Sequence, residues 1–296
     1  MDCENLTDLQ KNIVKSAGEE NLSILAVAGS GKTTVLVCSA LKIIEKIGNV
    51  EKALEKMLII TFTDEAATQL KERLLSKLRE KYQYIGPLEN VSTIHSFCNR
   101  ILKDSSIFLG INPEYSVGDE PSLKRIMDET FREVLDKIDG MDSTIIDSIT
   151  NFLNLEGQRG SRRRRKGLKD LLFTLYEKTK VMGWTVEKTK EEIEKVNIEE
   201  NEENRKFIES LEIIFEEFFK NIEEKKKHEG VLSYDDILSD AKIPLENEVV
   251  GNEWKNRFDY IIVDEYQDTS YIQQEIIEMV GERARKIYAG DYFQSI

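Results

Sequence analysis

The stretch AVAGSGKTT, residues 26–34, restricts the fold of this chain more than any other part of its sequence. It joins a short apolar run at residues 23–28, which predicts a buried strand, to residues 33–47, whose apolar stripe predicts a helix. Glycines at positions 29 and 31 permit a turn whose backbone N–H groups point inward, and the helix start adds the positive end of its dipole. This order is typical of an α/β fold with a parallel sheet.

The stretch has the spacing of the P-loop, with Ala26 in place of the usual first glycine. Lys32 is expected to reach the β- and γ-phosphates of a bound nucleotide, and Thr33 to offer its hydroxyl to Mg²⁺. A glycine-rich turn with an incidental lysine is the weaker interpretation, because strand, helix and Lys-Thr pair all stand where the motif requires them. The predicted nucleotide-binding residues here are Ala26, Val27, Ala28, Gly29, Ser30, Gly31, Lys32, Thr33 and Thr34.

A second pattern, FDYIIVDEYQDTS at residues 258–270, predicts the other half of the site. Its apolar run at residues 260–263 is expected of a strand covered on both faces, and Asp264 and Glu265 follow directly. Open α/β sheets bind their ligands at the carboxyl ends of their strands. Asp264 is therefore predicted to hold Mg²⁺, and Glu265 to orient and deprotonate the water that attacks the γ-phosphate. Capping of a helix that starts near Ser270 would explain one acid but not the pair.

The predicted strands imply that two separate parts of the chain build one parallel-sheet domain. The strands are expected at residues 23–28, 57–62, 89–93, 259–263 and 285–289. They predict a P-loop ATPase domain made of residues 1–103 plus 230–296. Residues 104–229 show no strand alternation and predict an inserted, mostly helical domain.

The distribution of charge bears on nucleic-acid binding. The formal net charge of −14 argues weakly against it, but many acids lie at residues 187–230, where the apolar spacing places them on the outer face of a helix. Residues 159–166 form a basic run. This run is interpreted either as a solvated, mobile loop flanked by glycines or as a contact for DNA phosphates, whose binding would depend on salt.

The cysteines Cys3, Cys38 and Cys98 have neither metal nor disulfide spacing, which is typical of a reducing cytoplasm. Together with two histidines they cannot readily build a zinc site, so a bound metal is expected to be a hard cation with oxygen ligands. No apolar stretch approaches a membrane span, and the N-terminus lacks a signal-peptide core. A cytoplasmic protein without a membrane partner is therefore expected.

Ordered segments along nearly the whole chain resemble the motifs of the UvrD/Rep-type superfamily 1 DNA helicases. They are LTDLQKNIV (Q motif), AVAGSGKTT (motif I), LIITFTDEAATQLKERL (motif Ia), VSTIHSFCNRIL (motif Ib), VLSYDDIL (the segment before motif II), IIVDEYQDTSYIQQ (motif II) and YAGDYFQSI (motif III). STIHSFC, TFTDEAATQLKERL and the long helical insertion most resemble the AddA and RecB-like recombination helicases.

The resemblance implies that the sheet domain is RecA-like and gives further residues a role. Gln10 would contact the adenine edge, Gln294 would sense the γ-phosphate, and Asp291 would help to hold the loop that carries it. The implied catalytic residues are Lys32, Asp264, Glu265 and Gln294, and the implied cofactors are ATP and Mg²⁺.

The resemblance also implies a DNA-binding edge. Phe62, at the end of an apolar strand, would offer an unpaired base a stacking platform worth roughly 1–3 kcal/mol, although taken alone it is better interpreted as a core residue. Thr63, Thr93, His95 and Ser96 would contact backbone phosphates without selecting a sequence. Taken alone, His95 is better interpreted as a capping or packing residue.

The function implied is that of the N-terminal part of an ATP-dependent 3′–5′ DNA helicase or translocase in repair or recombination. Its expected partners are single-stranded DNA, single-strand/duplex junctions and a second recombination or repair subunit. The chain ends after motif III, so it is expected to lack the second RecA-like domain with its arginines and to be poorly active alone.

Two other functions stay open: a non-catalytic DNA-binding or regulatory fragment, and a P-loop kinase or switch that is indifferent to DNA. The adjacent Asp-Glu pair favours hydrolysis over a kinase, because water needs to be activated.

Overall fold

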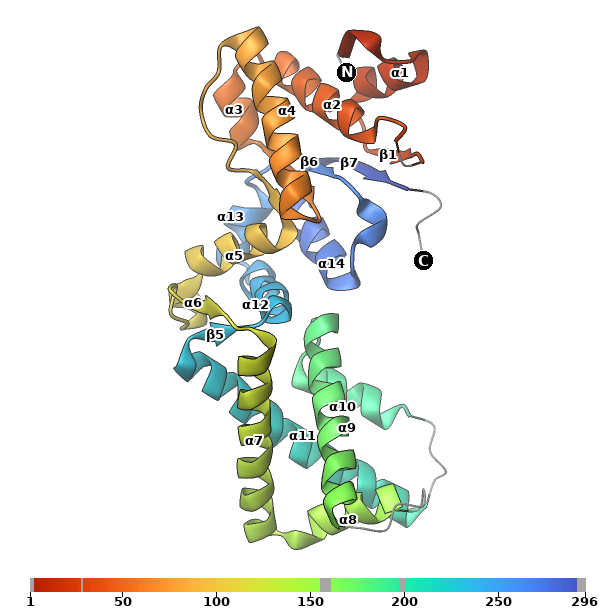
Figure 1. Cartoon of the computed structure of the whole chain (residues 1–296), viewed down its shortest axis with the longest axis vertical. Helices are drawn as coiled ribbons and strands as arrows, with labels where there is room; N and C mark the ends of the chain where they lie inside the picture. The colour runs from red at the N-terminus through yellow and green to blue at the C-terminus, as the bar shows by residue number, and fades with distance from the viewer. Residues whose placement is uncertain (1–2, 28, 155–160, 197–200, 292–296) are drawn as a thin grey trace. The chain divides into compact units, whose positions relative to one another are not determined.

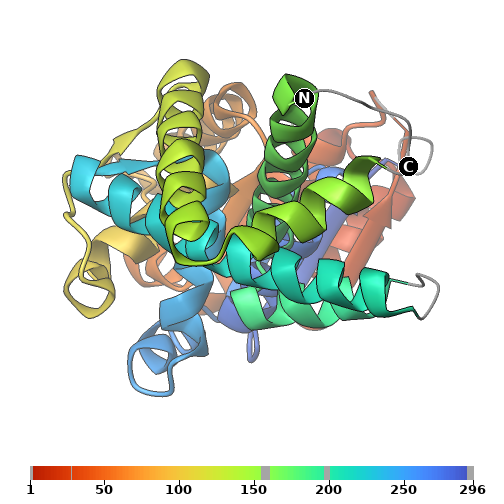
Figure 2. The same cartoon turned by 90° about the horizontal axis from the view of Figure 1, so that it is seen from below.

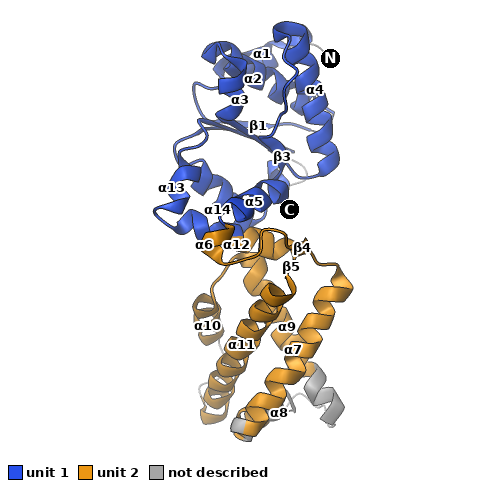
Figure 3. Ribbon diagram, turned by 90° about the vertical axis from the view of Figure 1, so that its left-hand side faces the viewer, with its two compact units in different colours: residues 1–105, 241–296 blue, residues 106–240 orange. Residues whose placement is uncertain are grey.

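The computed structural model describes residues 3–27, 29–154, 161–196 and 201–291. The chain divides into two compact units (Figure 3). The first unit consists of Met1–Ser105 and Ala241–Ile296, and the second of Ser106–Asp240. The two ends of the chain therefore build one unit together.

Within the described residues, the first unit is built around a five-stranded sheet whose neighbouring strands are all parallel. The strand order is β1-β7-β6-β2-β3. The strands are β1 (Leu22–Leu25), β2 (Met57–Thr61), β3 (Val91–Thr93), β6 (Tyr260–Val263) and β7 (Arg285–Gly290). They lie within a few residues of the predicted strands, and the prediction of an α/β fold with a parallel sheet is confirmed.

Helices cover both faces of this sheet (Figure 1). One side carries α1 (Asp8–Ser16), α2 (Lys32–Ile47), α3 (Val50–Glu55) and α4 (Asp64–Tyr82), and the other carries α5 (Ile94–Asp104), α13 (Val250–Lys255) and α14 (Tyr271–Val280). Two short 3-10 helices are η1 (Cys3–Asn5) and η2 (Tyr266–Asp268). Because both faces are covered, a central strand is mostly apolar, and every residue of β2, including Thr61, is buried.

The packing of α2 on the sheet holds the start of this helix beside the carboxyl ends of the strands. Ile59, Ile262 and Ile287 come from three different strands and share one buried cluster with Val35 and Ile44 of α2. Full burial of such a side chain stabilises the fold by about 1.5–3 kcal/mol. The cluster therefore gives the segments that follow the strands a firm base.

The second unit is mostly helical. Its helices are α6 (Ser106–Leu109), α7 (Glu120–Met141), α8 (Ser143–Asn154), α9 (Ser161–Met182), α10 (Val186–Glu194), α11 (Glu202–Glu229) and the first part of α12 (Tyr234–Glu246). The long helices α7, α9 and α11, which are yellow-green, green and teal in Figure 2, share a core with Phe131, Leu172 and Phe218. β4 (Ser116–Val117) pairs in parallel with β5 (Val231–Leu232), a short sheet that the sequence pattern did not predict.

Part of the basic run at residues 159–166 is helical. Residues 161–166 form the first turns of α9, whereas residues 155–160 lie outside the described part of the chain. The prediction of a loop is therefore wrong for residues 161–166, and a contact of this run with DNA stays a prediction. In the described parts of the chain, no helix has the length and apolarity needed to cross a membrane.

Cys3 and Cys38 form a disulfide, so the interpretation that the cysteines lack disulfide spacing is wrong. Their Cα atoms are 5.8 Å apart, within the range that a disulfide can bridge. The bond ties η1 to α2, while Cys98 is free and buried. Sequence spacing did not reveal the pair because α1 packs against α2 and returns the N-terminus to it.

Candidate functional site

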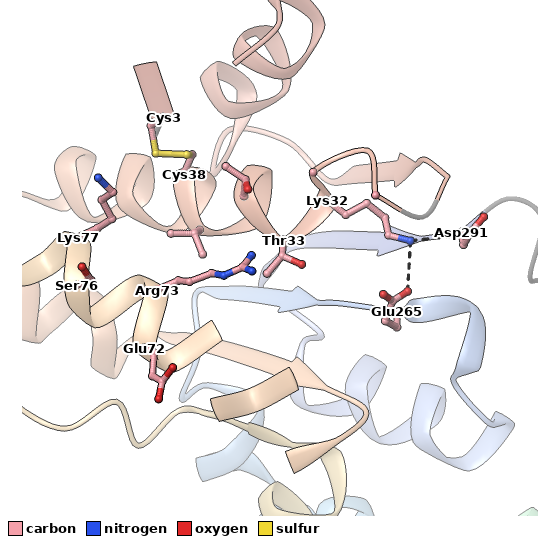
Figure 4. Close-up of a pocket in the computed structure, with 14 residues that line it drawn as sticks. Cys3, Lys32, Thr33, Cys38, Glu72, Arg73, Ser76, Lys77, Glu265 and Asp291 are labelled. Carbon is pink, nitrogen blue, oxygen red and sulfur yellow. Dashed lines mark ion pairs between the residues drawn. A yellow bond between two sulfur atoms is a disulfide. The ribbon is translucent and has the colours of Figure 1, made fainter. Parts of the chain in front are cut away.

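A pocket of about 900 Å³ lies at the carboxyl edge of the sheet in the first unit (Figure 4). β1, β7 and β6 are consecutive in the sheet, so the segments that follow them meet there. The glycine-rich turn follows β1, Glu265 follows β6 and Asp291 follows β7. From these segments, the lining residues are Gly29, Gly31, Lys32, Thr33, Thr34, Glu265 and Asp291. The structure thus brings six of the predicted nucleotide-binding and catalytic residues together in this pocket, namely Gly29, Gly31, Lys32, Thr33, Thr34 and Glu265.

The turn after β1 has the backbone conformation that its glycines predict. Gly29 and Gly31 have φ angles of 77° and 89°, in the left-handed region that favours glycine. A Cβ on Gly29 would meet nothing within 4 Å, so backbone conformation rather than lack of space requires this glycine. Gly31 is the N-cap of α2 and gives the helix no side-chain cap. The first N–H groups of α2 can therefore bind an anion. Ala28 lies outside the described residues.

Lys32 is a buried cation directed at two acids. Its side chain is 8% exposed, and its Nζ lies 3.4 Å from Glu265 Oε2 and 4.0 Å from Asp291 Oδ2. Nζ also lies 3.5 Å from the carbonyl oxygen of Ala26. A buried ammonium needs such acceptors, and phosphate oxygens would serve it equally well.

Asp264 and Thr33 are neighbours, as the predicted Mg²⁺ site requires. Asp264 is buried and lies near the side chain of Thr33, and it accepts the backbone N–H of Glu265 at 3.0 Å. Burial raises the pKa of Asp264, and the like charge of Glu265 raises it further, while the Glu265 N–H, Lys32 and Thr33 act in the opposite direction. An additional cation would therefore stabilise the charged form of this carboxylate.

The residues present fit Mg²⁺ held by a nucleotide. Mg²⁺ commonly uses one or two carboxylates and completes its octahedron with phosphates and water. One buried carboxylate, Asp264, beside one hydroxyl, Thr33, is such a partial ligand set. No group of three or more His, Cys, Asp and Glu side chains that could hold a metal by itself occurs among the described residues.

Glu265 has an unusual backbone conformation. Its φ and ψ of 51° and 43° lie in the left-handed region, which is rare for a residue with a Cβ. This conformation ends β6 abruptly and turns the side chain into the pocket, where it is 39% exposed. Gln267 donates a hydrogen bond to Glu265 Oε2 at 2.9 Å. Glu265 is thus a carboxylate with access to water, as a general base requires.

Gln10 lies against the glycine-rich turn. It forms a capping box with Thr7 at the start of α1, and its Nε2 donates to the carbonyl oxygen of Ser30 at 3.0 Å. A Cβ on Gly31 would lie 3.3 Å from the same Nε2. The structure thus joins the Q-like segment to the turn, while contact of Gln10 with adenine stays a prediction.

Helix α4 contributes pocket residues that the sequence interpretation missed. These are Glu72, Arg73, Ser76 and Lys77. In Figure 4 the guanidinium of Arg73 extends toward Thr33, and both cysteines of the Cys3–Cys38 disulfide also line the pocket. The spacing of Arg73 and Lys77, one helical turn apart, was the available signal, but only the packing of α4 shows which way it faces.

The expected DNA-binding residues gather at the carboxyl ends of β2 and β3, which are paired in the sheet with Thr61 opposite Thr93. Phe62 follows β2 and is half-buried, so it is not a core residue. The hydroxyl of Thr63 caps α4 by accepting the N–H of Ala66 at 3.1 Å.

Thr93, the last residue of β3, has a local role as well. The buried Thr93 caps α5: its hydroxyl accepts the N–H of Ser96 at 3.2 Å and donates to the Ser96 hydroxyl at 2.9 Å. His95 is half-buried in the first turn of α5, and Ser96 is exposed. DNA contact by these five residues stays a prediction. Gln294, the expected γ-phosphate sensor, lies outside the described residues.

Comparison with known proteins gives one family and several relatives. The model of the family described as "UvrD/REP helicase N-terminal domain" matches residues 6–296. The chain is 25% identical over 284 residues to a "Probable DNA helicase II homolog" of Mycoplasma capricolum, a match that covers 95% of this chain and 33% of the relative. It is 25% identical over 306 residues to an "ATP-dependent helicase/nuclease" subunit of Acetivibrio thermocellus, covering 92% of this chain and 23% of the relative. The chain thus spans a third or less of these relatives' length.

Proposed function

Because the chain belongs to the UvrD/REP helicase family, we propose that it is the nucleotide-binding N-terminal part of an ATP-dependent DNA helicase. The observation that carries this proposal is the position of Lys32. Its buried ammonium stands at the start of α2, 3.4 Å from the carboxylate of Glu265, so a cation for the phosphates of ATP and a base for the attacking water meet in one pocket.

The side chains of the pocket divide the chemistry among them. Lys32 and the N–H groups at the start of α2 bind the phosphates, and Asp264 with Thr33 holds Mg²⁺. The bound Mg²⁺ supplies neutralisation of charge on the phosphates during hydrolysis. Glu265 accepts a proton from the attacking water through its exposed carboxylate. Gln294 senses the γ-phosphate.

The nucleoside part of ATP is proposed to lie toward Gln10 and α4. The Gln10 amide, now bonded to Ser30, exchanges that partner for the adenine edge. Arg73 lines the pocket and extends toward Thr33, so its guanidinium provides a second cation for the phosphates (Figure 4).

The first unit is the proposed ATPase domain, and the second the inserted helical domain. Single-stranded DNA is proposed to lie along the carboxyl ends of β2 and β3, with a base stacked on Phe62. The four polar residues Thr63, Thr93, His95 and Ser96 contact its phosphates.

The whole protein is proposed to act in the cytoplasm as a 3′–5′ helicase or translocase of DNA repair or recombination. Several relatives are named as one subunit of an "ATP-dependent helicase/nuclease", which supports recombination and a partner protein that completes the enzyme. Single-stranded DNA and single-strand/duplex junctions are the proposed substrates.

The test measures Mg-ATP binding and ATP turnover by this chain, with and without single-stranded DNA, beside a Glu265→Gln variant. We expect binding in both proteins and turnover above background only with Glu265. Absence of Mg-ATP binding would overturn the proposal. Turnover that persists in the variant would remove Glu265 from the catalytic role.

A further inference from the structure

The side-chain amide of Gln267 connects two separate parts of the site. Its Nε2 donates to Glu265 Oε2 at 2.9 Å and to Asp268 Oδ2 at 3.1 Å. Its Oε1 accepts the backbone N–H of Asp291 at 2.9 Å. One side chain thus bonds to the carboxylate that follows β6 and to the backbone that follows β7.

This connection is supported by the way η2 packs on β7. The ring of Tyr266 stacks on that of Tyr288, with centroids 4.3 Å apart and planes 28° from parallel. A Cβ on Gly290 would lie 3.0 Å from Gln267 Oε1, closer than side chains normally approach, so glycine at this position leaves room for the amide. The residues around Gln267 therefore restrict its side chain to this place.

Gln267 and Lys32 share one oxygen of Glu265. Lys32 Nζ lies 3.4 Å from Oε2, the same atom that accepts from Gln267 Nε2. The phosphates of ATP, which carry several negative charges, compete with Glu265 for Lys32. When Lys32 turns to them, Gln267 keeps its hydrogen bond to this oxygen.

A fixed partner matters here because Glu265 has a backbone conformation that costs energy. Its left-handed φ of 51° is stable only when the surroundings hold it. A base acts efficiently only when its carboxylate is aimed at the attacking water, and a misplacement of about 1 Å can cost about 100-fold in rate.

We propose that Gln267 is a positioning residue for ATP hydrolysis, which aims the Glu265 carboxylate and ties it to the backbone of Asp291. The inference rests on the proposed function. Because one amide makes both bonds, a displacement of Asp291 would move the donor that holds Glu265.

The test replaces Gln267 by methionine, which keeps the length of the side chain but neither donates nor accepts these bonds. The matched control is Gln69→Met, since Gln69 on the exposed face of α4 donates to Glu65 Oε1 at 3.3 Å outside the pocket. Single-turnover hydrolysis of radiolabelled ATP gives the rate, and affinity is measured with a non-hydrolysable ATP analogue.

For Gln267→Met we expect hydrolysis to fall roughly 10- to 100-fold while affinity changes less than about threefold. Gln69→Met should behave as the wild type. A merely structural role would lower affinity and rate together.

A second variant, Gln267→Glu, decides the matter if the methionine variant does not fold. Its carboxylate would repel Glu265, so a loss of rate at least as large is expected. A wild-type rate in the folded variants, or equal losses of affinity and rate, would overturn the inference.

The wild type separates this inference from the proposed function. If it binds Mg-ATP but hydrolyses it no faster than Glu265→Gln, there is no base to position, and the inference fails while nucleotide binding stands. If it does not bind Mg-ATP, the proposed function itself fails.

Discussion

Lys32 and Glu265, which come from opposite ends of the chain, form an ion pair across the pocket, with Nζ and Oε2 3.4 Å apart. Glu265 is 39% exposed, so the pair adds little to stability. Its importance is that both partners are the groups proposed to act on the phosphates of ATP. The chemistry of the site therefore depends on whether Lys32 pairs with the Glu265 carboxylate or with the phosphates of ATP.

Replacing Lys32 by alanine should weaken Mg-ATP binding roughly 10- to 100-fold, because a charge-assisted hydrogen bond is worth about 1.5–3 kcal/mol. Titration with a fluorescent ATP analogue measures this. Lys42→Ala is the matched control, since Lys42 lies on the same helix and pairs with Glu45 at 3.3 Å on the surface. Equal affinities of the two variants would contradict the assignment of Lys32.

Replacing Asp264 by asparagine should stabilise the nucleotide-free protein at neutral pH. The pKa of Asp264 is raised by burial, so the folded state favours the protonated form, and wild-type stability falls as pH rises through that raised pKa. The uncharged variant avoids this loss. The difference in Tm should therefore grow from about pH 4, near the unfolded pKa, toward neutrality.

Thermal unfolding without Mg²⁺ at several pH values tests this prediction. The exposed Asp259 provides the control Asp259→Asn, for which no such trend is expected. With Mg-ATP present the wild type should have the higher Tm of the two, because only the wild type keeps the carboxylate that binds the metal. A variant that is equally stabilised by Mg-ATP would argue against Asp264 as a ligand.

Reduction of the Cys3–Cys38 disulfide should lower the stability of the first unit. The bond joins residues 35 positions apart, and closing a loop of this length stabilises a fold by roughly 3–4 kcal/mol in the chain-entropy model. Denaturant unfolding with and without a thiol reductant measures the effect. The Cys3→Ser variant should be as stable as the reduced wild type, and its stability should not change when reductant is added. A wild type that is indifferent to reductant would mean that the bond is not formed.

Asp236→Asn should destabilise the second unit by about 3 kcal/mol, because it leaves two buried lysines with less opposite charge. Asp236 is fully buried, with Lys180 Nζ at 3.0 Å and Lys226 Nζ at 2.5 Å. Burial would raise the pKa of Asp236, but the two lysines hold it well below its usual range. The stability that this carboxylate contributes is thus present above about pH 4 and lost as pH falls further.

The two tryptophans allow this loss to be followed in one unit. Trp184 belongs to the second unit and Trp254 to the first. In a Trp254→Phe background, fluorescence of Trp184 reports unfolding of the second unit alone. Asp170→Asn, at an exposed position of α9, serves as control. Equal stability of the two variants at pH 7 would show that the ion pairs of Asp236 with Lys180 and Lys226 do not stabilise the second unit.

Local pattern was enough to predict the parallel sheet and the two halves of the site. Gly29 and Gly31 specify the turn because their φ angles are ones that other residues avoid. Asp264 and Glu265 end a strand whose apolar run requires cover on both faces. Each of these two patterns is contained in a few consecutive residues, so the sequence alone reveals it.

Contacts between distant segments were decided only by the tertiary structure. The strand order places β7 between β1 and β6, and this brings Lys32, Glu265 and Asp291 together and lets Gln267 bond to the backbone of Asp291. The packing of α1 on α2 pairs two cysteines whose spacing gave no sign of it, and the packing of α4 turns Arg73 into the pocket. Periodicity states which residues an element buries, but not which other element it packs against, and that choice makes these contacts.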